Sequence, residues 1–134
     1  MSKGQKTKYN SVLLIDDNEI DNYINERVIL SNDFAKEVIV YSSGEEALEF
    51  LRSGDYTPDI IFLDLSMPIM DGFVFLQQYE ELLKNKSALK EKTKIIVLSS
   101  SINPEDIDRV SVNPYVYKYI NKPLSSDYLN AINY

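Results

Sequence analysis

Ile60-Ile61-Phe62-Leu63-Asp64 is a run of apolar residues that ends on a carboxylate. A short apolar run of this kind predicts a strand that is buried on both faces. A carboxylate at the end of such a strand is poorly solvated unless a cation meets it. Val12-Leu13-Leu14-Ile15 repeats the pattern and is followed by Asp16 and Asp17. Two strand ends with three carboxylates predict a divalent metal site beside a reactive aspartate.

The rest of the chain alternates between apolar or β-rich runs and segments that begin with helix-capping residues. Strand and helix alternate five times, which predicts a parallel sheet covered by helices on both faces. The strands are expected at Val12–Asp16, Val38–Tyr41, Ile60–Asp64, Lys94–Leu98 and Val116–Ile120, and helices are expected to start near Asn18, Ser43, Asp71, Asn103 and Ser125.

Helical spacing predicts which faces of the helices turn toward the core. In the first helix, Ile20, Tyr23, Ile24 and Val28 recur at this spacing and form the expected apolar stripe. The polar, lysine-rich segment Lys84–Thr93 is expected to connect the third helix to the fourth strand and to prolong that helix.

The composition sets limits on the function. A chain of 134 residues fits one domain, for which we expect a flexible tail at residues 1–10 and a folded part at 11–134. The net charge of −7 argues against a broad nucleic-acid footprint, and no apolar stretch approaches the ~20 residues of a membrane span. The chain has no cysteine, which suits a reducing cytoplasm. It has no histidine, which excludes imidazole bases and histidine metal ligands.

Ligands of such sheets bind outside the carboxyl ends of the strands, where Asp16, Asp17, Asp64, Ser99 and Lys122 are all expected. Carboxylates without histidine suit Mg²⁺, which usually shares its site with phosphoryl oxygens. Lys122 and Ser99 supply a positive charge and a hydroxyl that can hold the other phosphoryl oxygens. Asp64 is then the best candidate for a phosphoryl-accepting nucleophile.

These motifs resemble the receiver domain of two-component response regulators. The resemblance rests on five motifs in order and covers residues 10 to 134: Asp16-Asp17, Asp64 to Pro68, Asp71-Gly72, Ser99 and Lys122-Pro123. It implies a doubly wound, CheY-like α/β fold with strand order 2-1-3-4-5. No output domain follows, so the chain is most similar to stand-alone receivers, which are cytoplasmic signalling modules rather than enzymes and catalyse only their own phosphorylation and dephosphorylation.

The resemblance also implies roles for individual residues. Asp64 accepts a phosphoryl group from a phosphohistidine on a sensor histidine kinase or a histidine phosphotransfer protein. Asp17 binds Mg²⁺ directly, Asp16 binds it through water, and the backbone carbonyl of Ser66 is a further ligand. Lys122 pairs with the phosphoryl group and precedes a cis peptide bond.

The family switch implies a change of surface after phosphorylation. Ser99 moves toward the phosphoryl group and Tyr119 rotates inward, which alters the face of the fourth helix, fifth strand and fifth helix for a downstream protein. The tyrosine-rich segments Tyr115–Tyr119 and Tyr128–Tyr134 add the hypothesis of a homodimer through this face.

Two other classes of function compete with this interpretation. An aspartyl phosphatase of the haloacid dehalogenase type needs a second acid two residues after the nucleophile, and Ser66 occupies that position. A phosphorylation-independent scaffold or a flavodoxin-like cofactor binder is the second alternative. No glycine-rich loop follows the first strand to hold a cofactor phosphate, which argues against cofactor binding.

Overall fold

The computed structural model describes residues 7–65, 71–100 and 103–133, which form a five-stranded parallel sheet with helices on both faces. The strand order is β2-β1-β3-β4-β5, so the predicted doubly wound fold is confirmed. The strands are β1 (Tyr9–Ile15), β2 (Ala35–Tyr41), β3 (Ile60–Leu63), β4 (Lys94–Ser99) and β5 (Val116–Asn121). The helices are α1 (Glu19–Ser31), α2 (Gly44–Ser53), α3 (Gly72–Leu83), α4 (Ser87–Lys92), α5 (Pro104–Ser111) and α6 (Ser126–Asn130).

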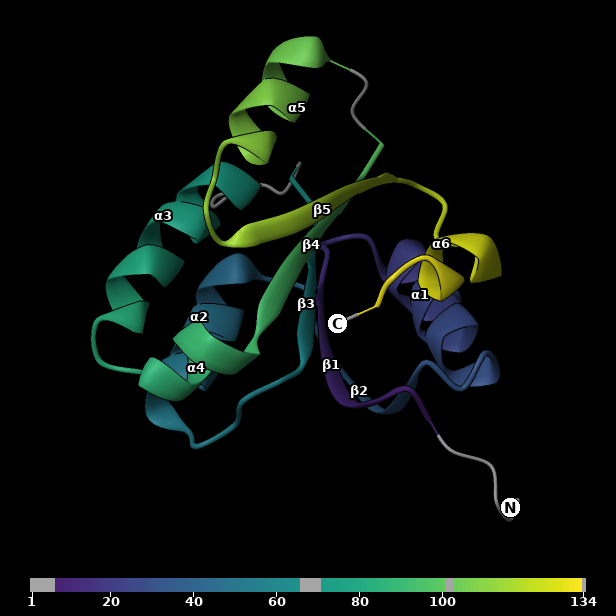
Figure 1. Ribbon diagram of the computed structural model, residues 1–134, viewed down its shortest axis with the longest axis horizontal. Helices are drawn as coiled ribbons and strands as arrows, with labels where there is room; N and C mark the ends of the chain where they lie inside the picture. Colours follow the sequence, from purple (N-terminus) through teal and green to yellow (C-terminus); the bar gives the residue numbers. More distant parts are fainter. Residues whose placement is uncertain (1–6, 66–70, 101–102, 134) are drawn as a thin grey trace.

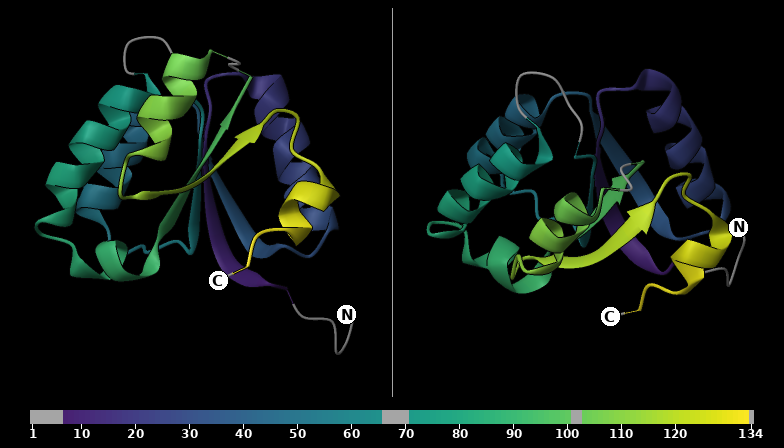
Figure 2. Two further views of the ribbon diagram at one scale, coloured as in Figure 1. Left: turned by 45° about the horizontal axis from the view of Figure 1, so that its top comes forward. Right: turned by 90° about the horizontal axis from the view of Figure 1, so that it is seen from above.

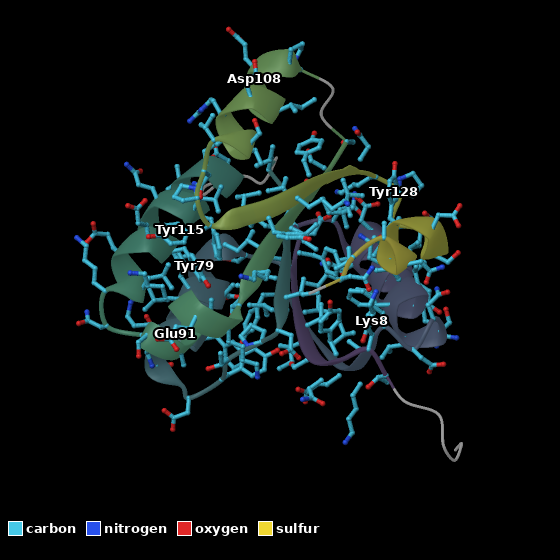
Figure 3. The ribbon with its side chains drawn as sticks, in the orientation of Figure 1. Lys8, Tyr79, Glu91, Asp108, Tyr115 and Tyr128 are labelled. Carbon is cyan, nitrogen blue, oxygen red and sulfur yellow. The ribbon has the colours of Figure 1, made fainter. Side chains whose placement is uncertain are left out.

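The sheet separates two layers of helices. Figure 1 shows α1 and α6 on one side of the strands and α2, α3 and α4 on the other. The views in Figure 2 keep the same division. Alternate residues of β1 supply the two cores, since Val12 packs toward α1 and α6 whereas Leu13 packs toward α2 and α3. Tyr79 of α3, labelled in Figure 3, is almost fully buried in the second of these cores.

The predicted inner face of α1 is wrong in the first half of the helix, whereas Val28, the last residue of the predicted stripe, packs against the core. Ile20, Tyr23 and Ile24 expose 70, 64 and 45 % of their surface, whereas Asn22 and Asn25 are buried. The first half of the helix therefore presents apolar side chains to solvent and polar ones to the protein.

Contacts at the start of α1 explain this rotation. The side-chain amide of Asn22 donates a hydrogen bond of 2.6 Å to the backbone carbonyl of Asp16. The helix is capped by Asn18, whose side chain accepts from the backbone N–H of Asp21 at 3.0 Å. Ile29 then fills the core further along the helix. Because a buried amide needs a hydrogen-bond partner, these contacts decide which face of the helix turns inward.

The segment before β4 differs from the expectation. Helix α3 ends at Leu83 and is not prolonged, because a separate short helix, α4, follows it. Leu89 of α4 is buried and joins the core beneath α2 and α3, which fixes this helix against the domain. The fourth and fifth helices of the sequence prediction therefore correspond to α5 and α6.

The beginning of β1 lies beside the carboxyl-terminal part of the chain. Tyr9, three residues before the predicted start of the strand, already pairs with Ala35 of β2. The Lys8 ammonium contacts the backbone carbonyl of Ile132, and Figure 3 shows Lys8 below α6. Within the described residues, no helix combines the length and apolar character that a membrane span requires.

Candidate functional site

Asp16 and Asp64 lie side by side because they follow neighbouring strands. Ile15 of β1 is paired with Leu63 of β3, and the backbone N–H of Asp64 donates to the Ile15 carbonyl at 3.0 Å. Both carboxylates are buried, with 2 % of Asp16 and 4 % of Asp64 exposed. Two buried carboxylates on neighbouring strand ends repel each other, and a cation between them would compensate their charge.

Asp17 completes an oxygen-rich group at the same place. One carboxylate oxygen from each of Asp16, Asp17 and Asp64 lies within 4.8 Å of the other two. The chain offers neither histidine nor cysteine, so these oxygens form a hard donor set that fits Mg²⁺. Ser66, predicted to add a backbone carbonyl, lies outside the described residues.

Lys122 supplies the positive charge. It directly follows β5, its backbone N–H donates to the Ser99 carbonyl at 2.9 Å, and its peptide bond to Pro123 is cis. The ammonium nitrogen lies 2.7 Å from Asp16 Oδ2 and 3.4 Å from Asp64 Oδ1. It also lies 2.9 Å from Oδ2 of Asp21, in the first turn of α1.

The surrounding carboxylates keep the lysine charged. Burial alone lowers the pKa of the Lys122 ammonium, but the hydrogen bonds to Asp16 and Asp21 and the charge of Asp64 outweigh this effect. The net result is a pKa well above its ordinary value. Lys122 is therefore a fixed cation that lines the site and can offset negative charge on a bound group.

The site opens to solvent through a depression of about 360 Å³. Ser99, the predicted switch hydroxyl, is fully buried at the end of β4, and its neighbour Ser100 lines the depression. Tyr119 is half-buried against a small cluster that includes Val97 and Val110. The lining consists of Asp16, Asp17, Asn18, Asp21, Asp64, Ser100 and Lys122.

Gly72 supports the backbone that carries Asp64. Its N–H donates to the Leu65 carbonyl at 2.9 Å, and α3 starts there with Asp71 as its cap. A Cβ atom at position 72 would lie 2.7 Å from Leu65 Cα and 2.8 Å from the Asp64 carbonyl oxygen. Glycine is required at this position because the helix approaches the Asp64 loop so closely.

Sequence reasoning missed Asp21 as a member of the site. Its partner Lys122 is 101 residues away in the chain, so no local pattern points to the contact. With Asp21 included, three carboxylates lie within 3.4 Å of the Lys122 ammonium: Asp16, Asp21 and Asp64.

Known proteins resemble this chain in sequence and in fold. A family model of the response regulator receiver domain matches residues 12–133. The chain is 30 % identical over 118 residues to Response regulator Rcp1 of Synechocystis, covering 82 % of this chain and 77 % of that protein. It is 31 % identical over 131 residues to Sensor histidine kinase CheAY of Helicobacter pylori, covering 98 % of this chain but 15 % of that protein. A crystal structure of a two-component response regulator from Cytophaga hutchinsonii superimposes with a TM-score of 0.80 at 32 % identity, covering 92 % of each chain.

Proposed function

The chain belongs to the response regulator receiver family, and we propose on this basis that it accepts a phosphoryl group on Asp64 from a phosphohistidine of a partner protein. The observation that carries the proposal is the environment of Asp64. Its carboxylate is nearly buried, lies beside the oxygens of Asp16 and Asp17, and has the Lys122 ammonium 3.4 Å away. A nucleophile between a metal-binding group and a fixed cation suits phosphoryl transfer, which depends mainly on positioning and electrostatics.

The transfer is a displacement at phosphorus. An Asp64 carboxylate oxygen forms the new P–O bond while the P–N bond of the phosphohistidine breaks, and the imidazole leaves with the electron pair and takes up a proton. With acetyl phosphate as donor, a P–O bond breaks and acetate leaves. Lys122 offsets the charge of the phosphoryl oxygens, and water later hydrolyses the acyl phosphate.

Asp16, Asp17 and Asp64 would hold Mg²⁺, with the Ser66 carbonyl as a further proposed ligand. When bound, the ion would neutralise the carboxylates and the phosphoryl oxygens that approach them. The three carboxylates support this assignment because their oxygens converge without any softer ligand nearby among the described residues.

Mg²⁺ is expected to raise the melting temperature of the protein, and Asp17→Asn is expected to remove most of that gain. A bound dication relieves repulsion among the site carboxylates, and a ligand at about 100 times its Kd stabilises by about 2.7 kcal/mol. Calorimetry with MgCl₂ or with NaCl of equal ionic strength measures the difference. Glu19→Gln, which removes an exposed acid from the first turn of α1, is the matched control and is expected to keep the gain. The metal assignment is wrong if MgCl₂ and NaCl give the same wild-type melting temperature.

The exposed apolar side chains of α1 support a docking site for the phosphodonor protein. Ile20, Tyr23 and Ile24 lie in the first half of the helix, and Asp21 between them contacts Lys122 in the site. A protein that delivers a histidine to Asp64 must cover the rim of the depression. The exposed apolar groups stand on the same helix as Asp21 and the capping residue Asn18, which line the depression, and provide a surface that such a partner can bury.

Ile20→Ser is expected to slow transfer from a phosphorylated histidine phosphotransfer domain by roughly 5- to 30-fold, the range for an interface anchor. The same variant is expected to react with acetyl phosphate at the wild-type rate, because the small donor needs no docking surface. Leu30→Ser, at the far end of the same exposed helix, is the matched control. Rates are measured with a phosphotransfer domain that phosphorylates the wild type, and equal slowing with both donors would contradict the docking site.

The face of α5, β5 and α6 is the proposed output surface. Val112 and Tyr117 expose 80 and 49 % of their surface there, and Figure 3 labels Tyr128 on α6. Ser99 and Tyr119 are proposed to transmit the change from the phosphoryl group to this face. The hypothesised homodimer through the same face stays a prediction.

Incubation with acetyl phosphate and Mg²⁺, followed by intact mass spectrometry, tests the proposed function. The expected result is a gain of one phosphoryl group that requires Mg²⁺. Sustained hydrolysis of a phosphomonoester, without accumulation of phosphorylated protein, would instead favour the aspartyl phosphatase.

A further inference from the structure

Asp21 holds the lysine of the site from outside the metal-binding group. Among the described residues, the Lys122 ammonium makes its two short hydrogen bonds to Asp16 Oδ2 at 2.7 Å and to Asp21 Oδ2 at 2.9 Å. Asp64 Oδ1 is farther away, at 3.4 Å. Asp21 is not in the group of three carboxylates whose oxygens all lie within 4.8 Å of one another. It therefore binds the lysine without being a candidate metal ligand.

The fold keeps Asp21 in this position. Its backbone N–H donates to the capping side chain of Asn18 at 3.0 Å. The next residue, Asn22, is buried and donates to the Asp16 carbonyl at 2.6 Å. The first turn of α1 is thus tied to the end of β1, and the Asp21 carboxylate is held near the Asp16–Lys122 pair.

The Lys122 ammonium has two sets of possible partners: the carboxylates of Asp16 and Asp21, and a phosphoryl group on Asp64. A phosphoryl group on Asp64 brings negative charge that attracts the Lys122 ammonium, whose hydrogen bonds are at present made to Asp16 and Asp21. Asp16 is a candidate metal ligand, so a bound cation competes with the lysine for it. Asp21 is not a candidate metal ligand, so its hydrogen bond to Lys122 is not in competition with a bound cation.

We propose that Asp21 is a positioning residue that holds Lys122 in the unphosphorylated protein and competes with the phosphoryl group on Asp64 for it. The inference rests on the proposed function. An interaction that is made before phosphorylation and weakened afterwards opposes phosphorylation, because it stabilises only the starting state. The negative charge of Asp21 also repels an incoming anionic donor. Both effects predict that removal of this carboxylate favours the phosphorylated state.

The sign of the effect separates this role from a purely structural one. If Asp21 only kept Lys122 in a productive orientation, its loss would slow phosphorylation and weaken binding of a phosphoryl mimic. Competition predicts the opposite for both quantities. The side chain of Asp21 is 36 % exposed, so solvent screens the ion pair and a change of about two- to five-fold is expected.

The experiment compares wild type, Asp21→Asn, Asp21→Ser and Asp21→Glu in Mg²⁺, with Glu19→Gln as an exposed control on the same turn. Two quantities are measured: the rate of phosphorylation by acetyl phosphate, and the affinity for beryllofluoride by fluorine NMR. Asp21→Asn and Asp21→Ser are expected to raise both by about two- to five-fold, and the gain is expected to shrink at high salt. Asp21→Glu and Glu19→Gln are expected to stay near wild type.

Several outcomes would overturn the inference. Unchanged or lower values for both Asp21→Asn and Asp21→Ser, in a wild-type protein that is itself phosphorylated, would show that Asp21 does not compete for Lys122. An equal gain for Glu19→Gln would assign the effect to general charge and not to the contact. A wild type that neither takes up a phosphoryl group nor binds beryllofluoride would overturn the proposed function itself.

Discussion

Asp64→Ala is expected to abolish phosphorylation by acetyl phosphate, so that intact mass spectrometry finds no gain after incubation with Mg²⁺. The acceptor must be a nucleophile that faces both the metal-binding oxygens and the fixed cation. Asp64 has this position, since its carboxylate joins the group formed by Asp16 and Asp17 and lies 3.4 Å from the Lys122 ammonium. Alanine removes the attacking oxygen, and no covalent product can form at that position.

Asp55→Ala is the matched control, because this aspartate is exposed and stands outside the site. It is expected to gain one phosphoryl group like the wild type. Circular dichroism checks that Asp64→Ala is folded. A full mass gain in folded Asp64→Ala would mean that another residue is the acceptor, and the assignment of Asp64 would be wrong.

Gly72→Ala is expected to destabilise the protein by about 1–3 kcal/mol, the usual cost of overpacking a closely packed position. The added Cβ would stand 2.7 Å from Leu65 Cα and 2.8 Å from the Asp64 carbonyl oxygen. These are backbone atoms, so the clash cannot be relieved by turning a side chain. The urea midpoint is therefore expected to fall at an unchanged m value. Because the strained backbone carries Asp64, phosphorylation is expected to slow as well.

Gly54→Ala provides the comparison for Gly72→Ala. A Cβ at position 54 would meet the Phe50 carbonyl oxygen at 3.3 Å, which a small shift of the neighbour relieves. Its effect on the urea midpoint is expected to be clearly smaller. Equal midpoints for wild type and Gly72→Ala would show that the contact between α3 and the Asp64 loop is looser than described.

The sheet could be predicted because its strands are unambiguous in the sequence. Ile60–Leu63 is buried at every position, as expected for a parallel strand covered on both faces. Once the strands are parallel, their carboxyl ends share one edge, and this alone brings Asp16, Asp64 and Lys122 together.

The orientation of α1 could not be predicted from its apolar spacing. The spacing of Ile20, Tyr23 and Ile24 is that of a buried stripe, yet the structure exposes all three. Burial of Asn22 depends on a hydrogen bond to the Asp16 carbonyl, which exists only when the strand and the helix are already in place. Such a tertiary contact overrides the amphipathic pattern.

Three further details of the site could not be predicted because they also depend on tertiary contacts. The contact of Asp21 with Lys122 joins residues 101 apart. Gly72 was part of a predicted motif, but its close approach to the backbone of Asp64 and Leu65 depends on the folded position of another segment. The serine run after the fourth strand offered several hydroxyls. The structure buries Ser99 and lines the depression with Ser100, a distinction set by the path of the chain at the end of β4.

Locating the phosphoryl group itself is the most direct test of the proposed function. Borohydride reduces an aspartyl phosphate to homoserine, which peptide mass spectrometry assigns to one position. Protein phosphorylated with acetyl phosphate and Mg²⁺ is predicted to carry homoserine at position 64 and at no other aspartate. Homoserine in place of Asp16 or Asp17, or none at all in protein that has gained a phosphoryl group, would contradict the assignment of Asp64 as the acceptor.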